Sequence, residues 1–307
     1  MIPNSPIVSR CLTFSSPYSH PHLEVENAFH ALALDEHRST FSPTLWYIPP
    51  VKGSIPPTRR TQLKQCWFAG VHTDVGRGYD DHVPGDTADI TFAWMVDQCR
   101  GLLAFHEDRV SGMLKKGDFK RPEGDWAERD RDEENRESRV AKAKNWGLAD
   151  LHDSMTFPFK LVRSVNRSPG QYVLNASGFL QAVEEAWYAR LWSTVSGVFT
   201  DPPKDIPKLI STSEVIHPSV RMRRTQDPTY DPPALRGFNL HYDAAESRWT
   251  WIKKWTDHNG VIREHILDEE RIEKSSFSMI NVPQGMLKFR ADEKEPIPPK
   301  PKSGWRF

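Results

Sequence analysis

The sequence predicts an α/β fold, in which a sheet with flanking helices is followed by an irregular C-terminal region that contains a β-hairpin. Residues 63–71 form a short apolar run bounded by polar residues and glycine, which is typical of a central strand. Apolar residues at helical spacing come before and after this run, and a strictly alternating segment comes near residue 250. At 307 residues, the chain is long enough to bury a substantial core.

The segment before the central strand has the spacing of an amphipathic helix. Val25, Ala28, Phe29 and Leu32 lie at i, i+3, i+4 and i+7, so a helix is predicted over residues 23–37. Residues 48–60 contain four prolines and a glycine, which predicts a surface loop.

A second helix is expected after the central strand and its glycine-containing loop. Asp86 or Thr87 can cap it, and the stripe that it would bury is Phe92, Met95, Val96, Cys99 and Leu103, widened by Ile90, Ala93 and Trp94. Residues 106–148 are dense in both charges and are interpreted as a charged insertion.

Downstream, the patterns predict a helix over residues 179–195, a hairpin over residues 248–267 with its turn at Asn259-Gly260, and a disordered proline- and lysine-rich tail. The chain is accordingly divided into four parts: residues 1–105 with the predicted sheet, the charged insertion 106–148, a helical and hairpin extension over residues 149–285, and the tail 286–307.

Bulk properties exclude several partners. The 41 basic and 41 acidic residues balance, so no global field attracts nucleic acid. Three widely spaced cysteines suit free thiols better than a disulfide framework or zinc ligands. Neither a signal peptide nor a transmembrane segment is evident, which favours a cytoplasmic protein.

The candidate catalytic residue is His72. It stands where the apolar run breaks into an acidic, glycine-bearing loop, a common way to deliver an imidazole to the open edge of a sheet. No G-x-S-x-G element occurs in the chain, so no nucleophile is assigned. Ser9 has an adjacent arginine but no flanking glycines, which makes it a poor substitute.

Three blocks carry a resemblance to a known family: residues 25–36 with the Phe41, Pro43, Leu45 and Trp46 positions behind them, residues 67–79, and residues 88–96. They resemble the lipase-like α/β-hydrolase family that includes the catalytic domain of bacterial type VI secretion phospholipase effectors and uncharacterised eukaryotic microbial members. The resemblance implies a partial α/β-hydrolase-like sheet and hydrolysis of lipid carboxylic esters, and it makes residues 1–105 the C-terminal portion of the family's catalytic domain.

In this family the resemblance implies a Ser-Asp-His triad. Its serine elbow G-F-S-R-G and its aspartate loop D-T-V-G precede the matching blocks, and neither motif is present here. The histidine of the G-V-H-S-D-V-G-G-G-Y loop corresponds to His72, and Asp74, Gly76, Gly78 and Asp35 are supporting positions. Thr73 and Arg77 depart from the loop pattern, and a left-handed backbone at Arg77 would be strained.

Structural interpretations remain beside these assignments. His72 could be a hydrogen-bonded strand-end histidine. Asp74 could orient His72, although an Asx-turn contact is favoured. Asp35 could form a local salt bridge with Arg38 or reach toward the sheet edge, and the structural role is favoured. The acidic and histidine residues of the loop could hold a metal, but capping of the next helix is favoured, and no metal or other cofactor is assigned. Trp249 and Trp251 are expected in the core, and Arg221, Arg223 and Arg224 on a solvated patch.

Two functional hypotheses follow. The first is a truncated lipase- or phospholipase-like serine hydrolase, inactive by itself because the elbow and the triad aspartate are missing, whose lipid ester substrate would be processed only with the missing N-terminal half. The second is a non-catalytic module that associates with itself or with a partner protein through an exposed sheet edge.

Overall fold

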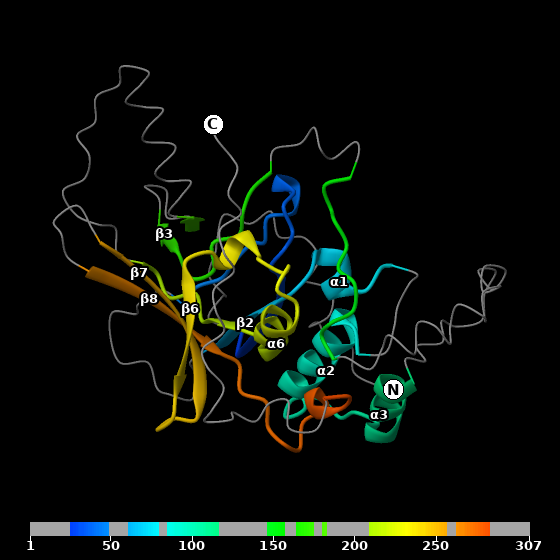
Figure 1. Ribbon diagram of the computed structural model, residues 1–307. Helices are drawn as coiled ribbons and strands as arrows, with labels where there is room; N and C mark the ends of the chain where they lie inside the picture. The colour runs from blue at the N-terminus through cyan, green and yellow to red at the C-terminus, as the bar shows by residue number, and fades with distance from the viewer. Residues whose placement is uncertain are drawn as a thin grey trace. The chain divides into compact units, whose positions relative to one another are not determined.

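The computed structural model describes residues 25–48, 61–79, 85–116, 146–156, 164–174, 180–182, 209–256 and 262–282 (Figure 1). The chain divides into two compact units: residues 1–28, 44–63 and 170–213 form one, and residues 29–43, 64–169 and 214–307 form the other. The first unit contains a short antiparallel pair, β3 (Tyr172–Leu174) and β4 (Leu180–Ala182). All other elements lie in the second unit, apart from the first two residues of β1 and of β2.

The second unit is built on a mixed six-stranded sheet, in agreement with the predicted α/β class. Its order is β1-β2-β5-β8-β7-β6. The strands are β1 (Asn27–Ala33), β2 (Gln62–Phe68), β5 (Glu214–Ile216), β6 (Phe238–Asp243), β7 (Arg248–Thr256) and β8 (Ile262–Glu269). The helices are α1 (His72–Gly76), α2 (Thr87–Cys99), α3 (Glu107–Lys116) and α6 (Pro218–Gln226), with 3₁₀ turns at Ser39–Phe41, Pro233–Leu235 and Phe277–Met279.

Four neighbouring strands of this sheet are parallel. β2 pairs in parallel with β5, and β5 with β8. Backbone bonds from Leu34 to Phe68 and from Asp35 to Gly70, both 3.0 Å, advance along β1 and β2 in the same direction. The carboxyl ends of these strands therefore meet at one edge, where α/β proteins usually bind their ligands.

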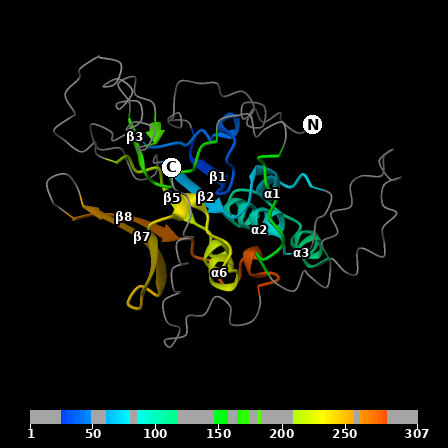
Figure 2. The ribbon, with the colours of Figure 1, turned by 45° about the horizontal axis from the view of Figure 1, so that its top comes forward.

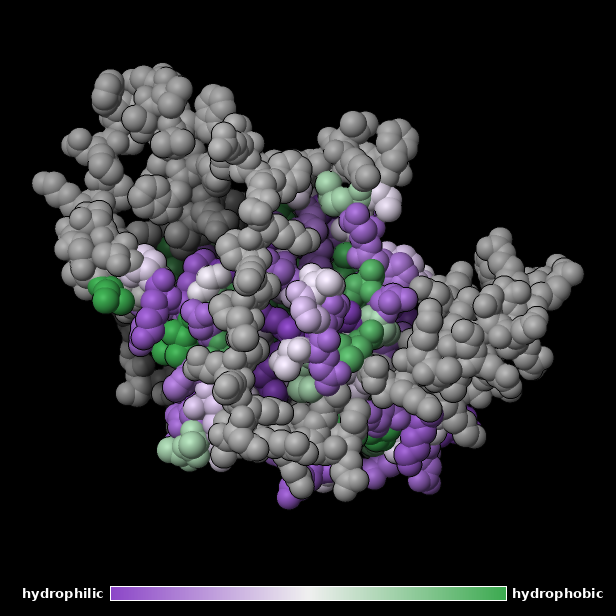
Figure 3. Space-filling model, in the orientation of Figure 1, coloured by the Kyte–Doolittle hydropathy of each residue, from purple (hydrophilic) through white to green (hydrophobic). Residues whose placement is uncertain are grey.

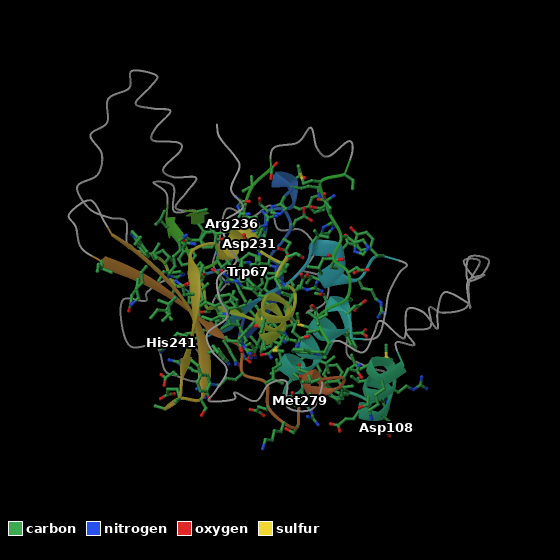
Figure 4. The ribbon with its side chains drawn as sticks, viewed as in Figure 1. Trp67, Asp108, Asp231, Arg236, His241 and Met279 are labelled. Atoms are coloured by element: carbon green, nitrogen blue, oxygen red, sulfur yellow. The ribbon has the colours of Figure 1, made fainter. Side chains whose placement is uncertain are left out.

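The sheet packs on α2 and α6 through aromatic side chains. Phe68 and Trp94 meet edge to face with ring centroids 5.6 Å apart, and Met222 of α6 belongs to the same buried cluster. Trp67 is fully buried on β2 and its indole N–H donates to Glu214 of β5 at 2.6 Å (Figure 4). Figures 1 and 2 both show α1 beside α2.

The first predicted helix is wrong, because residues 27–33 form strand β1. Ala28 and Leu32 are its buried side chains, and their four-residue separation is the spacing that suggested a helix. The backbone N–H and C=O groups of this segment bond to β2 and not within a helix, and β2 starts 35 residues later in the sequence.

The helix predicted at residue 86 is confirmed as α2. Asp86 caps it by accepting a 2.9 Å bond from the Asp89 backbone N–H. Its buried face is Ile90, Ala93, Trp94 and Val96, while Leu103 lies beyond the helix and is exposed. Of the charged insertion 106–148, α3 and residues 146–148 are described, and residues 117–145 lie outside the described residues.

The predicted hairpin is confirmed by β7 and β8, which pair antiparallel from Thr250 with Asp268 to Thr256 with Ile262. Trp251 is fully buried, as expected of a core strand position, whereas Trp249 is only half-buried. The helix predicted over residues 179–195 is wrong at its start, where Leu180–Ala182 is strand β4; residues 183–195 lie outside the described residues, as do the loop 49–60, Ser9 and the tail 286–307.

The expectation of a solvated arginine patch is also wrong. Arg221 and Arg223 are buried, and the Arg221 guanidinium bonds both carboxylate oxygens of Glu269 at 2.9 to 3.1 Å. Burial raises the pKa of Glu269, although Arg221 opposes this. Arg221 thus joins α6 to β8, whereas Arg223 donates to the Ala149 carbonyl and the half-buried Arg224 donates to the Phe238 carbonyl at 3.3 Å. On the face drawn in Figure 3, the described residues are mostly hydrophilic.

Candidate functional site

His72 lies near the carboxyl end of β2. The sequence predicted that it would be the last residue of that strand, but β2 ends earlier, at Phe68. Three residues separate it from Phe68, and it is the first residue of α1. Its side chain is 42 % exposed. The short connection turns the imidazole out of the sheet towards solvent and towards the segment that follows β1.

The segment after β1 supplies a carboxylate to His72. Glu36 Oε2 lies 2.6 Å from His72 Nδ1, and the Glu36 side chain is only 1 % exposed. Arg38 bonds the other oxygen through Nε at 3.0 Å and donates its backbone N–H to it at 3.0 Å. The sequence analysis found no counterpart of the family's triad aspartate and considered Asp74 as a residue that could orient His72. In the structure the carboxylate at Nδ1 is that of Glu36.

This arrangement decides the tautomer of His72. Nδ1 lies 2.6 Å from Glu36 and 2.9 Å from Arg38 Nη2. Arginine can only donate and a carboxylate only accept, so Nδ1 can bond one of them and not both. The shorter, charge-assisted contact makes Nδ1–H the donor to Glu36 and leaves a basic lone pair on Nε2.

The pKa of Glu36 lies well below its ordinary value. Burial by itself would raise this pKa, but hydrogen bonds from Arg38, and then from His72, outweigh it. Glu36 therefore stays a carboxylate throughout the physiological pH range, which is the state that holds the Nδ1–H of His72.

Two further groups contact the imidazole. The Thr73 hydroxyl lies 3.1 Å from Nε2. The Phe41 ring lies over the imidazole with centroids 4.5 Å apart, and the Arg38 guanidinium is 3.9 Å from the centre of the same ring. Arg167 fixes this segment by donating to the Phe41 carbonyl at 2.9 Å and to Ser42 Oγ at 3.1 Å.

Asp35 supports the turn after β2 through contacts to its backbone. Its Oδ2 accepts the Gly70 N–H at 2.6 Å and the Tyr230 hydroxyl at 2.9 Å. Burial raises the pKa of Asp35 to about 6, against these two hydrogen bonds, which lower it. The proposed salt bridge of Asp35 with Arg38 is not formed, because Arg38 bonds Glu36.

Asp74 fixes the start of α1 and receives an unexpected histidine. Its Oδ2 accepts the Val71 N–H at 2.9 Å, and its Oδ1 lies 2.6 Å from His152 Nδ1. The His152 ring stacks on Tyr79 at 3.5 Å. His152 was missed by the sequence analysis, because no motif surrounds it and it comes 78 residues after Asp74.

The glycines of the loop have different functions. A Cβ on Gly78 would lie 2.5 Å from Thr73 Cγ2, whereas one on Gly76 would meet nothing within 4 Å. Arg77 has a φ of 61°, the strained left-handed backbone that its place in a glycine loop predicted. The Arg77 guanidinium lies 3.7 Å from the Asp89 carboxylate, and this charge contact favours the strained conformation.

No group of three or more His, Cys, Asp or Glu side chains in the described residues is arranged to hold a metal ion. None of the helices that the structure describes is both long and apolar enough to cross a membrane. The contacts of His72 place a carboxylate at one imidazole nitrogen and a hydroxyl near the other.

The histidine and the glycine loop at this sheet edge belong to the sequence blocks that resemble the phospholipase effectors. Residues 2–98 match the T6SS phospholipase effector Tle1-like catalytic domain family. This match confirms the resemblance and includes Glu36, His72 and Thr73, but not His152. It supports a lipase- or phospholipase-like function and lipid substrates at the level of the family. No curated protein and no solved structure gives a significant match to the chain.

Proposed function

We propose that this chain carries the acid–base pair of a lipase-like carboxylic-ester hydrolase, on a partial α/β-hydrolase-like sheet. His72 is the general base and Glu36 the carboxylate that orients it. The 2.6 Å contact between Glu36 Oε2 and His72 Nδ1 is the observation that carries the proposal. It reproduces the geometry in which a buried acid holds a histidine so that Nε2 can accept a hydroxyl proton.

The remaining predicted residues take supporting functions in this proposal. Asp35 and Asp74 hold the backbone at Gly70 and Val71, which precede His72. A Cβ at Gly70 would lie 2.7 Å from Asp74 Oδ2, and its φ of 104° favours glycine, so the tight turn needs this residue. The result is a fixed direction for the imidazole.

The family's serine elbow is absent from this sequence, so we propose that the chain does not turn over phospholipid by itself. On activated esters, a general base contributes a factor on the order of 10² to 10⁴. We therefore expect slow release of p-nitrophenolate from p-nitrophenyl butyrate. We expect no release of fatty acid from phosphatidylcholine vesicles.

The test compares His72→Asn with His241→Asn, a matched change of an exposed histidine on β6 (Figure 4). His72→Asn should lower nitrophenolate release on the order of 10²-fold, and His241→Asn should leave it unchanged. Equal rates in both variants would contradict the proposal. Phospholipid turnover that depends on His72 would show that a nucleophile in this chain is sufficient.

A second readout needs no activity. The Nδ1–H that His72 donates to Glu36 should give a downfield proton resonance in the wild-type chain, as expected for a short charge-assisted hydrogen bond. Both Glu36→Gln and His72→Asn should remove it or move it upfield. A spectrum without this resonance in the wild-type chain would show that the imidazole is not held as described.

The alternative function is a non-catalytic interaction module. It is favoured by the place of β1 at one end of the sheet, where β2 is its only neighbour among the described strands. Unpaired strand edges promote association. Light scattering after size-exclusion chromatography distinguishes the two functions, because a monomer at all concentrations would argue against self-association through this edge.

A further inference from the structure

We propose that Thr73 is an acyl acceptor, whose hydroxyl is activated by His72 and Glu36 and takes the acyl group of an activated carboxylic ester. The proposal rests on the proposed function, because it needs His72 as a base. It goes beyond the family resemblance, which implies a serine in an elbow that this chain lacks.

The hydroxyl, the imidazole and the carboxylate lie in the order that proton transfer requires. Thr73 Oγ1 is 3.1 Å from His72 Nε2, and His72 Nδ1 is 2.6 Å from Glu36 Oε2. With Nδ1–H donated to Glu36, Nε2 is an acceptor and the Thr73 hydroxyl is its donor. This is the hydrogen-bond pattern of a nucleophile activated by an adjacent general base.

The position of the Thr73 hydroxyl is restricted by Gly78. Because Thr73 is β-branched, its χ1 has few allowed rotamers. A Cβ at Gly78 would be 2.5 Å from Thr73 Cγ2, so the backbone at residue 78 packs closely against this methyl group. The methyl is thereby directed to Gly78 while Oγ1 is directed to His72. Thr73 is half-buried and His72 exposed, so an ester can reach both.

A second contact between a hydroxyl and a histidine among the described residues, that of Ser219 with His217, lacks these properties. Ser219 Oγ lies 2.9 Å from His217 Nδ1, but both residues are buried and His217 Nε2 has no hydrogen-bond partner. No carboxylate orients this imidazole, and burial lowers the pKa of His217 to about 3. A base so weak accepts a hydroxyl proton poorly. The Ser219 backbone N–H also bonds Nδ1, which makes His217 a cap of α6.

The reaction transfers one acyl group and one proton. Thr73 Oγ1 forms a bond to the ester carbonyl carbon while its proton moves to His72 Nε2. The tetrahedral intermediate then collapses, and the bond from the carbonyl carbon to the ester oxygen breaks. An alkoxide leaving group takes the proton back from Nε2. p-Nitrophenolate instead leaves as the anion, and the imidazolium then passes its proton from Nε2 to water, which restores the neutral base. The product is an ester of Thr73, with Glu36 stabilising the intermediate imidazolium.

The experiment treats the full chain with p-nitrophenyl acetate and measures nitrophenolate release together with the acetyl groups on each peptide by mass spectrometry. We expect up to one acetyl group per chain on Thr73. Thr73→Val removes the hydroxyl and keeps the shape, so acetylation of this peptide should disappear, whereas Thr73→Ser should keep it. Unchanged circular dichroism of Thr73→Val shows that the variant is folded.

The matched control is Thr229→Val. Thr229 is exposed and its hydroxyl bonds a carboxylate, Asp227 Oδ1, at 2.5 Å, with no imidazole in that contact. This variant should be acetylated on Thr73 as the wild-type chain is. His72→Asn should lower Thr73 acetylation on the order of 10²-fold.

The outcomes separate this proposal from the proposed function. Acetylation of a different hydroxyl that still depends on His72 would overturn the assignment of Thr73 and leave His72 as the base. Acetylation of Thr73 that does not change in His72→Asn would contradict both. No acetylation of Thr73 in the wild-type chain would overturn the assignment, and loss of the His72 Nδ1–H resonance in Glu36→Gln would then still support the acid–base pair.

Discussion

Replacing Glu36 by glutamine tests the central pair of the site through stability. The substitution keeps the side-chain shape and one oxygen acceptor but removes the negative charge. That charge faces the Arg38 guanidinium at 3.0 and 3.1 Å and His72 at 2.6 Å, in a side chain that is 1 % exposed. Hydrogen bonds to charged groups contribute about 1.5 to 3 kcal/mol, and breaking a buried ion pair costs about 3 to 5 kcal/mol. Because glutamine keeps some of these bonds, we expect the free energy of unfolding to fall by about 2 to 4 kcal/mol at pH 7.

The effect should depend on pH with a definite sign. The pKa of Glu36 is lower in the folded chain than its ordinary value of about 4.3. The ionised carboxylate therefore stabilises the fold above about pH 4.3, and this contribution is lost as the pH falls towards the folded pKa. The difference between wild type and Glu36→Gln should be full at pH 7 and should narrow below about pH 4.

Urea unfolding followed by tryptophan fluorescence measures this difference, with Glu273→Gln as the control for loss of an exposed carboxylate. The control should change the free energy of unfolding by less than about 0.5 kcal/mol. If Glu36→Gln is as mild as the control at pH 7, or if its effect is the same at pH 7 and at low pH, the charge network around His72 is not formed.

Three other substitutions test the framework of the site. Arg221→Met leaves Glu269 buried without its bidentate partner and should cost about 3 to 5 kcal/mol in urea unfolding, most of which Arg221→Met with Glu269→Leu should restore. Gly70 has a φ of 104°, so Gly70→Ala should introduce strain of about 1 to 3 kcal/mol and lower the melting temperature by several degrees. The control Gly101→Ala should leave the melting temperature unchanged, because nothing lies within 4 Å of the added Cβ. The pKa of Asp35 is raised to about 6, so folding favours its protonated form. The contribution of Asp35 to the free energy of unfolding should therefore decrease as the pH rises from about 4 to about 6, and Asp35→Asn should abolish this decrease.

Elements with local signals could be predicted from the sequence, and those that depend on distant partners could not. The α2 helix has its own cap at Asp86, and the β7–β8 hairpin has an alternating pattern, so both were predicted. The β1 strand was predicted as a helix because Ala28 and Leu32 are four residues apart. Only its pairing with β2 distinguishes the two conformations, and no pattern within residues 23–37 reveals that partner.

The site shows the same limit. The motif around His72 pointed to the histidine, but its carboxylate partner comes 36 residues earlier and belongs to a segment that was interpreted as the end of a helix. A strand that ends at Ala33 brings Glu36 to the carboxyl edge of the sheet, which a helix over the same residues would not do. The error in the secondary structure and the missing carboxylate thus have one cause. His152 had no motif at all and is recognised only by its contact with Asp74.

The parallel order of β1 and β2 explains why a hydroxyl, an imidazole and a carboxylate meet without a serine elbow. Adjacent parallel strands end at the same edge, so the segments that follow them lie together although they are far apart in sequence. Glu36 follows β1 by three residues and His72 follows β2 by four, which places both just beyond that edge. Arg38 and Asp74 then hold these segments through Glu36 and Val71, respectively. The contact between Glu36 and His72, which we propose as an acid–base pair, consequently depends on two strands and two short connections, and it does not require the part of the family's triad that this sequence lacks.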